Sequence, residues 1–441
     1  MNGKRIYRTV DVEQISIPSL VESLPAGGCI VAVDVAKEDF VVGIAGPDGR
    51  VVRHVRFSHP RQTGLFLGHL EELRRSGCEP VVVLEPTGTY GDSLRSQLAL
   101  RGISVFSISP KRCHDAAELF DGVPSQHDAK STAILARLHA QGLSRVWNIE
   151  PESKRESRAV VERRELYQAA LNAHHGRLEA LLARHWPELG SFLDIRRRVS
   201  VLLLLETFPS PADVASHRDE VTALLCKTCR GQFTRDRVSG LIDSAARSLG
   251  MPLLPAERAL IQALATEMLR LRRMARLAER DIAKLVEQNH AMMNVARVVG
   301  RSTAAVLVSH LGEPAQYSSA AAFEKACGLN LKERSSGSHK GRLAITKRGP
   351  GRVRHYLFLA TLRLIQTDHV ARAWYATRSS FGPNCRLKAV IALMRKFVRA
   401  LWHVGRGAVF DSTKLFDTRR LRDIPRTALT RSERIEIGAA M

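Results

Sequence analysis

The sequence predicts an α/β amino-terminal domain with a mixed sheet, a long helical arm and a mainly helical carboxy-terminal domain. In the first third of the chain, short apolar runs alternate with helical patterns. In the middle, apolar residues recur every three or four positions over long stretches. The last third breaks into short helical segments separated by glycines. A chain of 441 residues has room for two or three such domains.

The amino-terminal part alternates strands and helices in an informative order. Strands are predicted for the apolar runs at residues 29–37, 39–46, 51–58, 80–85 and 103–109. The sequence "GPDG" favours a hairpin between the second and third of these strands. Helices are predicted for residues 61–77, 90–102, 110–120 and 127–142. An initial meander followed by parallel crossovers is the topology of ribonuclease-H-like domains, with helices on both faces of a mixed sheet.

The middle of the chain predicts two long helices. One runs from about Pro151 to Pro187 and the other covers residues 256–292, with a loop-rich, proline-containing stretch between them. Both charge signs lie between the apolar positions, which is typical of an antiparallel helical arm or coiled coil. Dimerisation is the natural use of such an arm. We therefore expect four parts: a catalytic α/β domain (1–150), a dimerisation arm (151–292), a mainly helical domain (293–411) and a basic, flexible tail (412–441).

The charge of the chain points to nucleic acid. The formal net charge is +23, which is the electrostatic signature of a protein that binds phosphate backbones. Hydrophobic residues make up 44% of the chain, so folded cores are expected rather than disorder. No apolar run reaches membrane-spanning length, and the first residues lack the apolar segment of a secretion signal. We expect no membrane contact.

The cysteines indicate a reducing compartment. There are seven, scattered along the chain, which favours free thiols and a cytoplasmic location over a disulfide scaffold. Cys226 and Cys229 form a CxxC pair that could bind zinc together with His217 or His185. Structural zinc needs four ligands and the spacing supplies only two, so two half-buried thiols are the alternative.

Three carboxylates are predicted to converge. Asp34 lies on the first strand of the meander, Glu85 ends the fourth predicted strand, and these strands are neighbours in a ribonuclease-H-like sheet. Asp128 begins a helix that would pack back across the sheet. Three carboxylates in one place repel one another unless a divalent cation holds them, and hard oxygen ligands suit Mg²⁺ or Mn²⁺. The alternatives are a turn cap for Asp34, a lysine pair for Glu85 and a helix N-cap for Asp128.

The segments "VAVDVAKEDF" and "VVVLEPTGTYG" resemble the amino-terminal, RuvC-like domain of the DEDD insertion-sequence transposases, as does the segment from Ser109 to Leu138. These enzymes are relatives of the pilin-gene inverting recombinase and act as bridge-RNA-guided recombinases. The similarity continues into "FEKACGLNLKERSSGSHKGRLAITKRGPGRVRHYL" near the other end of the chain. The resemblance implies four acidic metal ligands, which map onto Asp34, Glu85, Asp128 and the position three after Asp128.

That fourth position is Ser131, where the family has an aspartate. A serine hydroxyl is a neutral and poor metal ligand, so the site would carry one negative charge fewer. We expect that three carboxylates suffice and that Ser131 orients a water. The alternatives are reduced metal affinity and loss of activity.

The loop "RSSGSHKGRLAITKRGPGRVRH" places hydroxyls and glycines among many cations. By composition alone it is a solvated loop that touches DNA phosphates. The resemblance implies a nucleophilic serine just before the glycine of the "SG" pair, which is Ser336, with Ser335 as the neighbouring alternative. A serine that attacks phosphorus needs nearby positive charge. The residues that could supply this charge and bind nucleic acid are Arg334, Lys340, Lys347 and Arg348. The glycines expected to let the backbone approach a strand are Gly337, Gly341, Gly349 and Gly351.

Three functions remain open. The first is an insertion-sequence transposase that cuts and rejoins DNA through Ser336, aided by the metal site. The second is a RuvC-like, metal-dependent junction nuclease, which would use water and would not need Ser336. The third is a catalytically weakened nucleic-acid-binding protein, for which Ser131 is the best argument. The family implies a homodimer or homotetramer with a composite active site, a structured guide RNA, and action on DNA in the cytoplasm, at the nucleoid.

Overall fold

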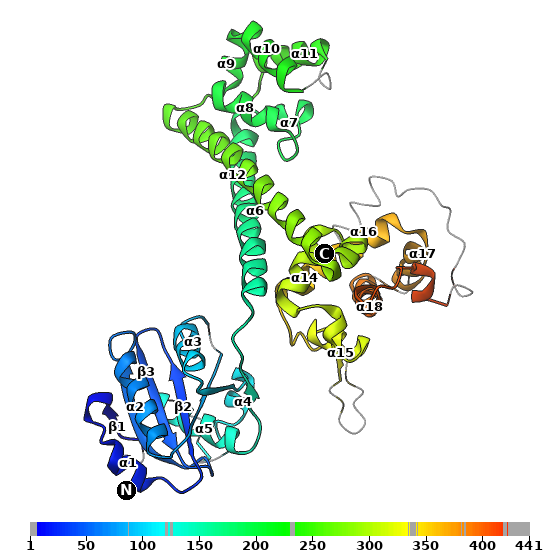
Figure 1. Cartoon of the computed structure of the whole chain (residues 1–441). Helices are drawn as coiled ribbons and strands as arrows, with labels where there is room; N and C mark the ends of the chain where they lie inside the picture. Colours follow the sequence, from blue (N-terminus) through cyan, green and yellow to red (C-terminus); the bar gives the residue numbers. More distant parts are fainter. Residues whose placement is uncertain are drawn as a thin grey trace. The chain divides into compact units, whose positions relative to one another are not determined.

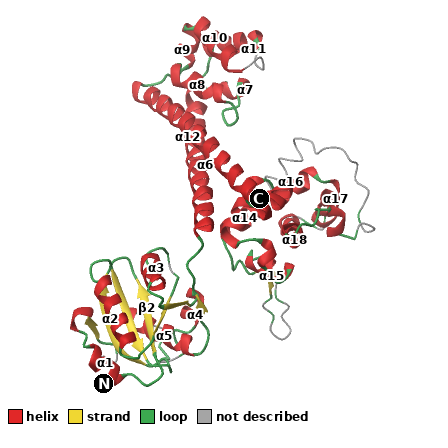
Figure 2. Ribbon diagram, viewed as in Figure 1, coloured by secondary structure: helices red, strands yellow, loops and turns green. Residues whose placement is uncertain are grey.

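The structure is a computed structural model. It describes residues 7–86, 88–119, 122–123, 127–229, 234–333, 335, 341, 343–380, 382, 385–417 and 421. The chain forms two compact units, Met1–Pro151 and Glu152–Met441, and each is described by itself. Strands gather in the first unit, whereas helices dominate the second (Figures 1 and 2). In the part of the chain that is described, no helix is long and apolar enough to cross a membrane.

The first unit is built on one mixed sheet. Its strands are β1 (Thr9–Asp11), β2 (Cys29–Val35), β3 (Asp39–Ala45), β4 (Val51–Ser58), β5 (Pro80–Leu84), β6 (Ser104–Ser107) and β7 (Arg145–Val146). They lie in the order β1-β4-β3-β2-β5-β6-β7. The strands β2, β3 and β4 form an antiparallel meander, and β5 and β6 are parallel to β2. The ribonuclease-H-like topology predicted from the sequence is confirmed. The edge strands β1 and β7 are too short to have been predicted.

Helices cover both faces of this sheet (Figure 1). They are α1 (Ile17–Ser23), α2 (Thr63–Arg75), α3 (Asp92–Leu100), α4 (Pro110–Asp115) and α5 (Asp128–Ala140). Successive strand residues point to opposite faces, so β2 feeds two separate cores. Val31 and Val33 belong to the core that includes α2 and α3. Ile30 and Ala32 belong to the core that includes α5.

The second unit begins with two long helices, α6 (Glu152–His185) and α12 (Pro255–Gln288), which pack along each other. The ion pairs Arg163–Asp281 and Arg184–Glu257 join them, and their order shows that the two helices are antiparallel. The apolar stripe of α12 is therefore buried against α6 of the same chain. The two long helices predicted from the sequence are confirmed, and their pairing lies within one chain.

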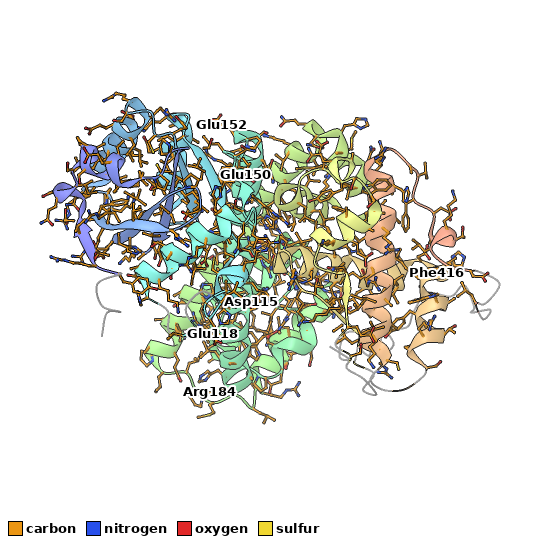
Figure 3. The ribbon with its side chains drawn as sticks, turned by 90° about the horizontal axis from the view of Figure 1, so that it is seen from below. Asp115, Glu118, Glu150, Glu152, Arg184 and Phe416 are labelled. Atoms are coloured by element: carbon orange, nitrogen blue, oxygen red, sulfur yellow. The ribbon has the colours of Figure 1, made fainter. Side chains whose placement is uncertain are left out.

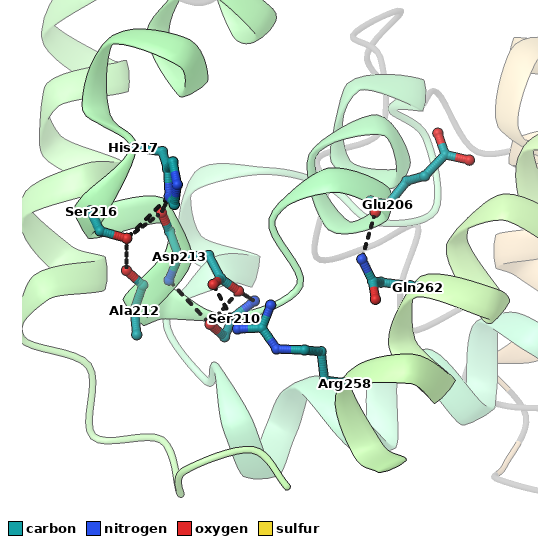
Figure 4. Close-up of polar contacts among 8 residues, drawn as sticks. All are labelled: Glu206, Ser210, Ala212, Asp213, Ser216, His217, Arg258 and Gln262. Carbon is teal, nitrogen blue, oxygen red and sulfur yellow. Dashed lines mark hydrogen bonds and ion pairs between the residues drawn. The ribbon is translucent and has the colours of Figure 1, made fainter. Parts of the chain in front are cut away.

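The prediction of a loop-rich stretch between these two helices is wrong. The stretch holds α7 (Leu189–Phe192), α8 (Val199–Thr207), α9 (Pro211–Ser216), α10 (Arg218–Cys229) and α11 (Arg235–Ala246). One of its prolines, Pro211, is the first residue of α9, where the missing N–H is no loss. Ser210 and Asp213 form a reciprocal capping box, and Arg258 of α12 donates to Asp213 at 2.6 Å (Figure 4). Short capped helices give a weak periodic signal and are easily taken for loops.

The rest of the described part of the second unit is a helical bundle with a small two-stranded sheet. Its helices are α13 (His290–Val299), α14 (Arg301–Leu311), α15 (Ala320–Ala326), α16 (Gly351–Thr367), α17 (His369–Ser379) and α18 (Cys385–Gly405). Strands β8 (Leu331–Lys332) and β9 (Ala344–Ile345) pair antiparallel. Short 3₁₀ turns lie at Val12–Gln14 in the first unit and at Pro314–Gln316 and Ser412–Leu415 here. Buried side chains such as Leu307, Phe323 and Phe397 share one core.

Candidate active site

Two carboxylates lie side by side at the ends of neighbouring parallel strands. Val33 of β2 is in register with Leu84 of β5, so the next residues along, Asp34 and Glu85, are neighbours. Ile30 and Ala32 share the strand face of Asp34, and Val83 shares that of Glu85. All three are in the core that includes α5, so both carboxylates lie on the α5 face of the sheet. Both side chains are half-buried.

Helix α5 brings the third carboxylate to this face. The helix begins at Asp128, and Ser131 lies one turn later on the same side of the helix. The side chain of His127, not that of Asp128, caps the helix by accepting a hydrogen bond from the Lys130 N–H. The capping alternative for Asp128 is therefore wrong. Its exposed carboxylate is available for other contacts.

Close packing sets the position of α5 on the sheet. Gly43 of β3 lies beneath Thr132 of α5, and a Cβ at Gly43 would lie 2.7 Å from the Thr132 Oγ1 atom. Thr132 is fully buried and donates its hydroxyl to the Ala129 carbonyl at 2.7 Å. Only a glycine at position 43 allows α5 to pack this close to β3. Because Asp128 and Ser131 belong to α5, this packing also sets their distance from the sheet.

The electrostatics show that the three carboxylates influence one another. Burial, together with the negative charges of Asp128 and Glu85, raises the pKa of Asp34 from 3.8 to about 6. A hydrogen bond from the Ser131 hydroxyl opposes this rise in the pKa of Asp34. Burial also raises the pKa of Glu85. Among the described residues, no lysine is seen in an ion pair with Glu85.

The structure adds a residue that the sequence did not single out. Cys113 of α4 hydrogen-bonds to Glu85, which opposes the effect of burial on the pKa of that carboxyl group. The pKa of Cys113 is in turn raised to about 12 by burial and by the charges of Glu85 and Asp34, so the thiol stays protonated. No local pattern marks Cys113, because its contact with Glu85 depends on how α4 packs beside the strand ends.

The donor chemistry of this cluster fits a hard divalent cation. Three carboxylates and one hydroxyl are oxygen ligands, and the raised pKa of Asp34 reports negative charge that lacks a positive partner. Among the described residues, however, no three His, Cys, Asp or Glu side chains are close enough together to hold a metal ion. Ligation would require the side chains of Asp34, Glu85 and Asp128 to draw together around the ion.

The basic loop near the other predicted site is described only in part. Ser336, Arg334 and Lys340 lie outside the described residues, as do Gly337 and most of the tail after Asp417. In sequence, Ser336 falls between β8 and β9. Lys347 and Arg348 are exposed just before α16, and Lys347 has a left-handed backbone with φ of 55°.

Gly349 lies close to the protein's own backbone. A Cβ at Gly349 would lie 2.4 Å from the backbone oxygen of Ala326, so the glycine allows this loop to pack against the end of α15. The Lys347 N–H donates to the Gly328 carbonyl at 3.0 Å and closes the same contact. The close approach at Gly349 is thus to the protein's own backbone. A Cβ at Gly351 would lie 3.7 Å from the Nη2 atom of Arg354, which is an ordinary van der Waals contact.

The CxxC pair lies at the end of α10. Cys226 is half-buried and packs against the core of the second unit, as expected for a structural thiol. The side chain of Cys229 lies outside the described residues. Of the two histidines considered as partners, His185 is buried and bonds to the Met251 carbonyl at 2.9 Å, and His217 bonds to the Asp213 carbonyl at 2.8 Å (Figure 4).

The strand order, the helices on both faces and the acidic strand ends define a ribonuclease-H-like domain of the kind found in enzymes that act on nucleic acids. A family model for a DEDD transposase, described as "Transposase", matches residues 31–187. A second, described as "Transposase IS116/IS110/IS902 family", matches residues 294–376. Together the two matches cover more than half of the chain. No curated protein is significantly similar to it.

The chain belongs to the IS110-type DEDD transposases of insertion sequences, as the resemblance predicted. It is a DNA-recombining enzyme, and transposases of this kind bind DNA. DEDD transposases generally depend on a divalent metal ion.

Proposed function

We propose that this transposase cuts and rejoins DNA through Ser336, with Asp34, Glu85 and Asp128 as the ligands of a divalent metal ion, Mg²⁺ or Mn²⁺. The observation that carries the proposal is that Asp34 and Glu85 end neighbouring strands on the α5 face of a ribonuclease-H-like sheet, within range of the charge of Asp128. Their mutual repulsion favours binding of a cation. The role of Ser336 is supported by its place in a segment that resembles the family's serine loop.

The chemistry is a phosphoryl transfer in two steps. The Ser336 hydroxyl attacks the scissile phosphate, a bond forms between its oxygen and phosphorus, and the bond to the leaving DNA oxygen breaks. The leaving oxygen takes up a proton and becomes a free hydroxyl. A hydroxyl of the partner DNA end then attacks the phosphoserine and releases Ser336. A bound metal ion would supply positive charge to the phosphate. Cations of the loop, such as Lys347 and Arg348, hold the strand in place.

The partners follow from the same proposal. The positive charge of the chain suits a complex that holds DNA together with a structured guide RNA in the cytoplasm, at the nucleoid. Ser336 and the carboxylates belong to different units of the chain. We propose that the active site is composite and forms in a homodimer or homotetramer.

The test is a search for a covalent protein–DNA adduct. The wild type, Ser336→Ala and Ser335→Ala are expressed beside the gene's own flanking DNA, the lysates are denatured, and DNA attached to protein is detected. We expect an adduct in the wild type and in Ser335→Ala, and none in Ser336→Ala. Loss of the adduct in Ser335→Ala alone would place the nucleophile one residue earlier.

Other outcomes point to the other functions. Strand cuts that survive Ser336→Ala, are lost in Asp34→Ala and leave no adduct in any variant would identify a metal-dependent nuclease. Salt-sensitive binding with neither cuts nor adduct, in the presence of the expressed RNA and Mg²⁺ or Mn²⁺, would identify a binding protein that has lost catalysis. Ser131 would then be the first position to restore to aspartate.

A further inference from the structure

A hollow of about 700 Å³ lies beside α17 and α18. Its lining includes the apolar side chains of Ala389 and Ala392, which we call the floor of the hollow. Five cations line it, and among the described residues no acidic side chain does. These cations are Arg378, Lys388, Arg395, Lys396 and Arg399. We call this hollow the α18 groove.

The cations of the α18 groove follow one face of a helix. Lys388, Ala392, Arg395 and Arg399 are spaced by four, three and four residues, so they form a single stripe along α18. At about 1.5 Å per residue, the stripe from Lys388 to Arg399 is about 16 Å long. A stripe of this length can contact more than one phosphate of the same nucleic-acid strand.

A buried carboxylate holds two of these arginines in place. Glu324 of α15 is only 1% exposed and accepts from Arg395 Nε at 2.6 Å and from Arg399 Nε at 2.5 Å. Each guanidinium therefore uses its Nε–H inside the protein. Among the described residues, no partner is seen for the terminal nitrogens of these two arginines, which are the donors that bind phosphate in a bidentate manner. Such anchoring reduces the entropy lost when a phosphate binds.

The apolar floor of the α18 groove requires a ligand that has an apolar surface as well as phosphates. The Trp374 ring already has two partners, because Phe416 (labelled in Figure 3) stacks on it with ring centres 5.1 Å apart and the Arg378 guanidinium lies over it, 5.7 Å from the ring centre. A ligand therefore meets Ala389 and Ala392. The flat face of a nucleic-acid base matches this small, apolar floor, but bases in a duplex are stacked on each other and cannot reach it.

We propose that the α18 groove binds an unpaired segment of nucleic acid, with phosphates on its arginines and lysines and one base against Ala389 and Ala392. The inference rests on the proposed function, because strand exchange must leave DNA strands, or a guide RNA, transiently unpaired. The groove would hold such a segment away from the duplex. DNA and RNA share this chemistry, and the test separates them.

The experiment measures binding by fluorescence anisotropy with the full-length chain in EDTA. The probes are a labelled 12-nucleotide single-stranded DNA, the same sequence as RNA, its duplex, and the single-stranded DNA with one central abasic position. The variants are the double change Arg378→Ala with Lys388→Ala, and Ala392→Phe, which fills the floor without changing charge. Ala392→Leu replaces Ala392→Phe if the latter lowers the melting temperature. The matched control is Arg280→Ala with Lys284→Ala, two exposed cations of α12.

We expect the groove double variant to bind both single strands about tenfold more weakly at 0.15 M salt. The slope of log K against log salt should fall by about 1.4, since each lost phosphate contact contributes about 0.7. Ala392→Phe should abolish the preference for the intact strand over the abasic one. The control should keep wild-type affinity and slope. The tighter of the two single-stranded probes identifies the natural ligand as DNA or RNA.

Three results would overturn the inference: wild-type affinity in the groove variants, an equal loss in the control, or an equal loss for duplex and single strand. Each leaves the proposed function intact, because covalent adduct formation is measured separately and without these variants. Conversely, if the adduct test fails while the groove variants lose single-strand binding as expected, the groove stands and the catalytic proposal falls.

Discussion

Replacing Asp34 by asparagine should stabilise the metal-free protein at neutral pH while it abolishes DNA cleavage. Burial and the charges of Asp128 and Glu85 raise the pKa of Asp34 from 3.8 to about 6. An acid with a raised pKa binds its proton more tightly in the folded state than in the unfolded state. It therefore destabilises the fold as the pH rises. Asparagine has nearly the same shape and no charge to bury.

The size and pH range of this effect follow from the pKa. At about 1.36 kcal/mol per pH unit, a rise from 3.8 to about 6 corresponds to about 3 kcal/mol. The destabilisation is nearly absent near pH 3, grows between about pH 4 and pH 6, and is complete above about pH 7. The stability gained by Asp34→Asn should follow the same curve.

The measurement is a urea titration in EDTA at several pH values. Pulsed hydrogen exchange of peptides that cover β2 and β5 reports unfolding of the first unit within the full-length chain. The control is Glu38→Gln, which removes the same charge from a side chain of the same unit that is 78% exposed. We expect the control to change the free energy of unfolding by less than about 0.5 kcal/mol.

A stability gain that does not vary with pH would show that charge repulsion is not its cause. A loss of stability at pH 7.5 would refute the reasoning outright, because it would mean that the charged form of Asp34 is favoured in the metal-free fold. Mg²⁺ should raise the stability of the wild type and leave that of Asp34→Asn almost unchanged.

Two further changes test packing and ion pairing. Gly43→Ala should lower the free energy of unfolding of the first unit by about 1–3 kcal/mol, because the new methyl group would have to move about 0.7 Å from Thr132 to reach ordinary contact. The same urea titration checks this, and Thr132→Ala in the same chain should restore part of the loss; a loss that persists unchanged would rule out the contact as its cause. Glu324→Gln should destabilise the second unit by about 2–4 kcal/mol, since Arg395 and Arg399 would lose a buried carboxylate but stay partly exposed to solvent. Exchange of α15 and α18 peptides in urea measures it, and unchanged exchange would show that these pairs do not stabilise the fold.

Local sequence patterns were sufficient to predict the central sheet and the residues that end its strands. In the β2 run "CIVAVDV" every residue except Asp34 is apolar, because both faces of that strand are covered. The one charged residue, Asp34, is therefore conspicuous. Glu85 is conspicuous for the same reason at the end of β5. The two long helices were also predictable, because their apolar residues recur over many turns.

Other features depend on contacts between residues that are distant in sequence, and only the tertiary structure decided them. The hydrogen bond between Cys113 and Glu85 joins α4 to the end of β5, and the close contact between Thr132 and Gly43 joins α5 to β3. No periodic pattern in the sequence predicts contacts of this kind. The α18 groove is a similar case, because its cations look like an ordinary solvated helix face until Glu324 anchors two of them. Periodicity reveals which face of an element is buried, whereas the identity of what buries it is settled by long-range packing.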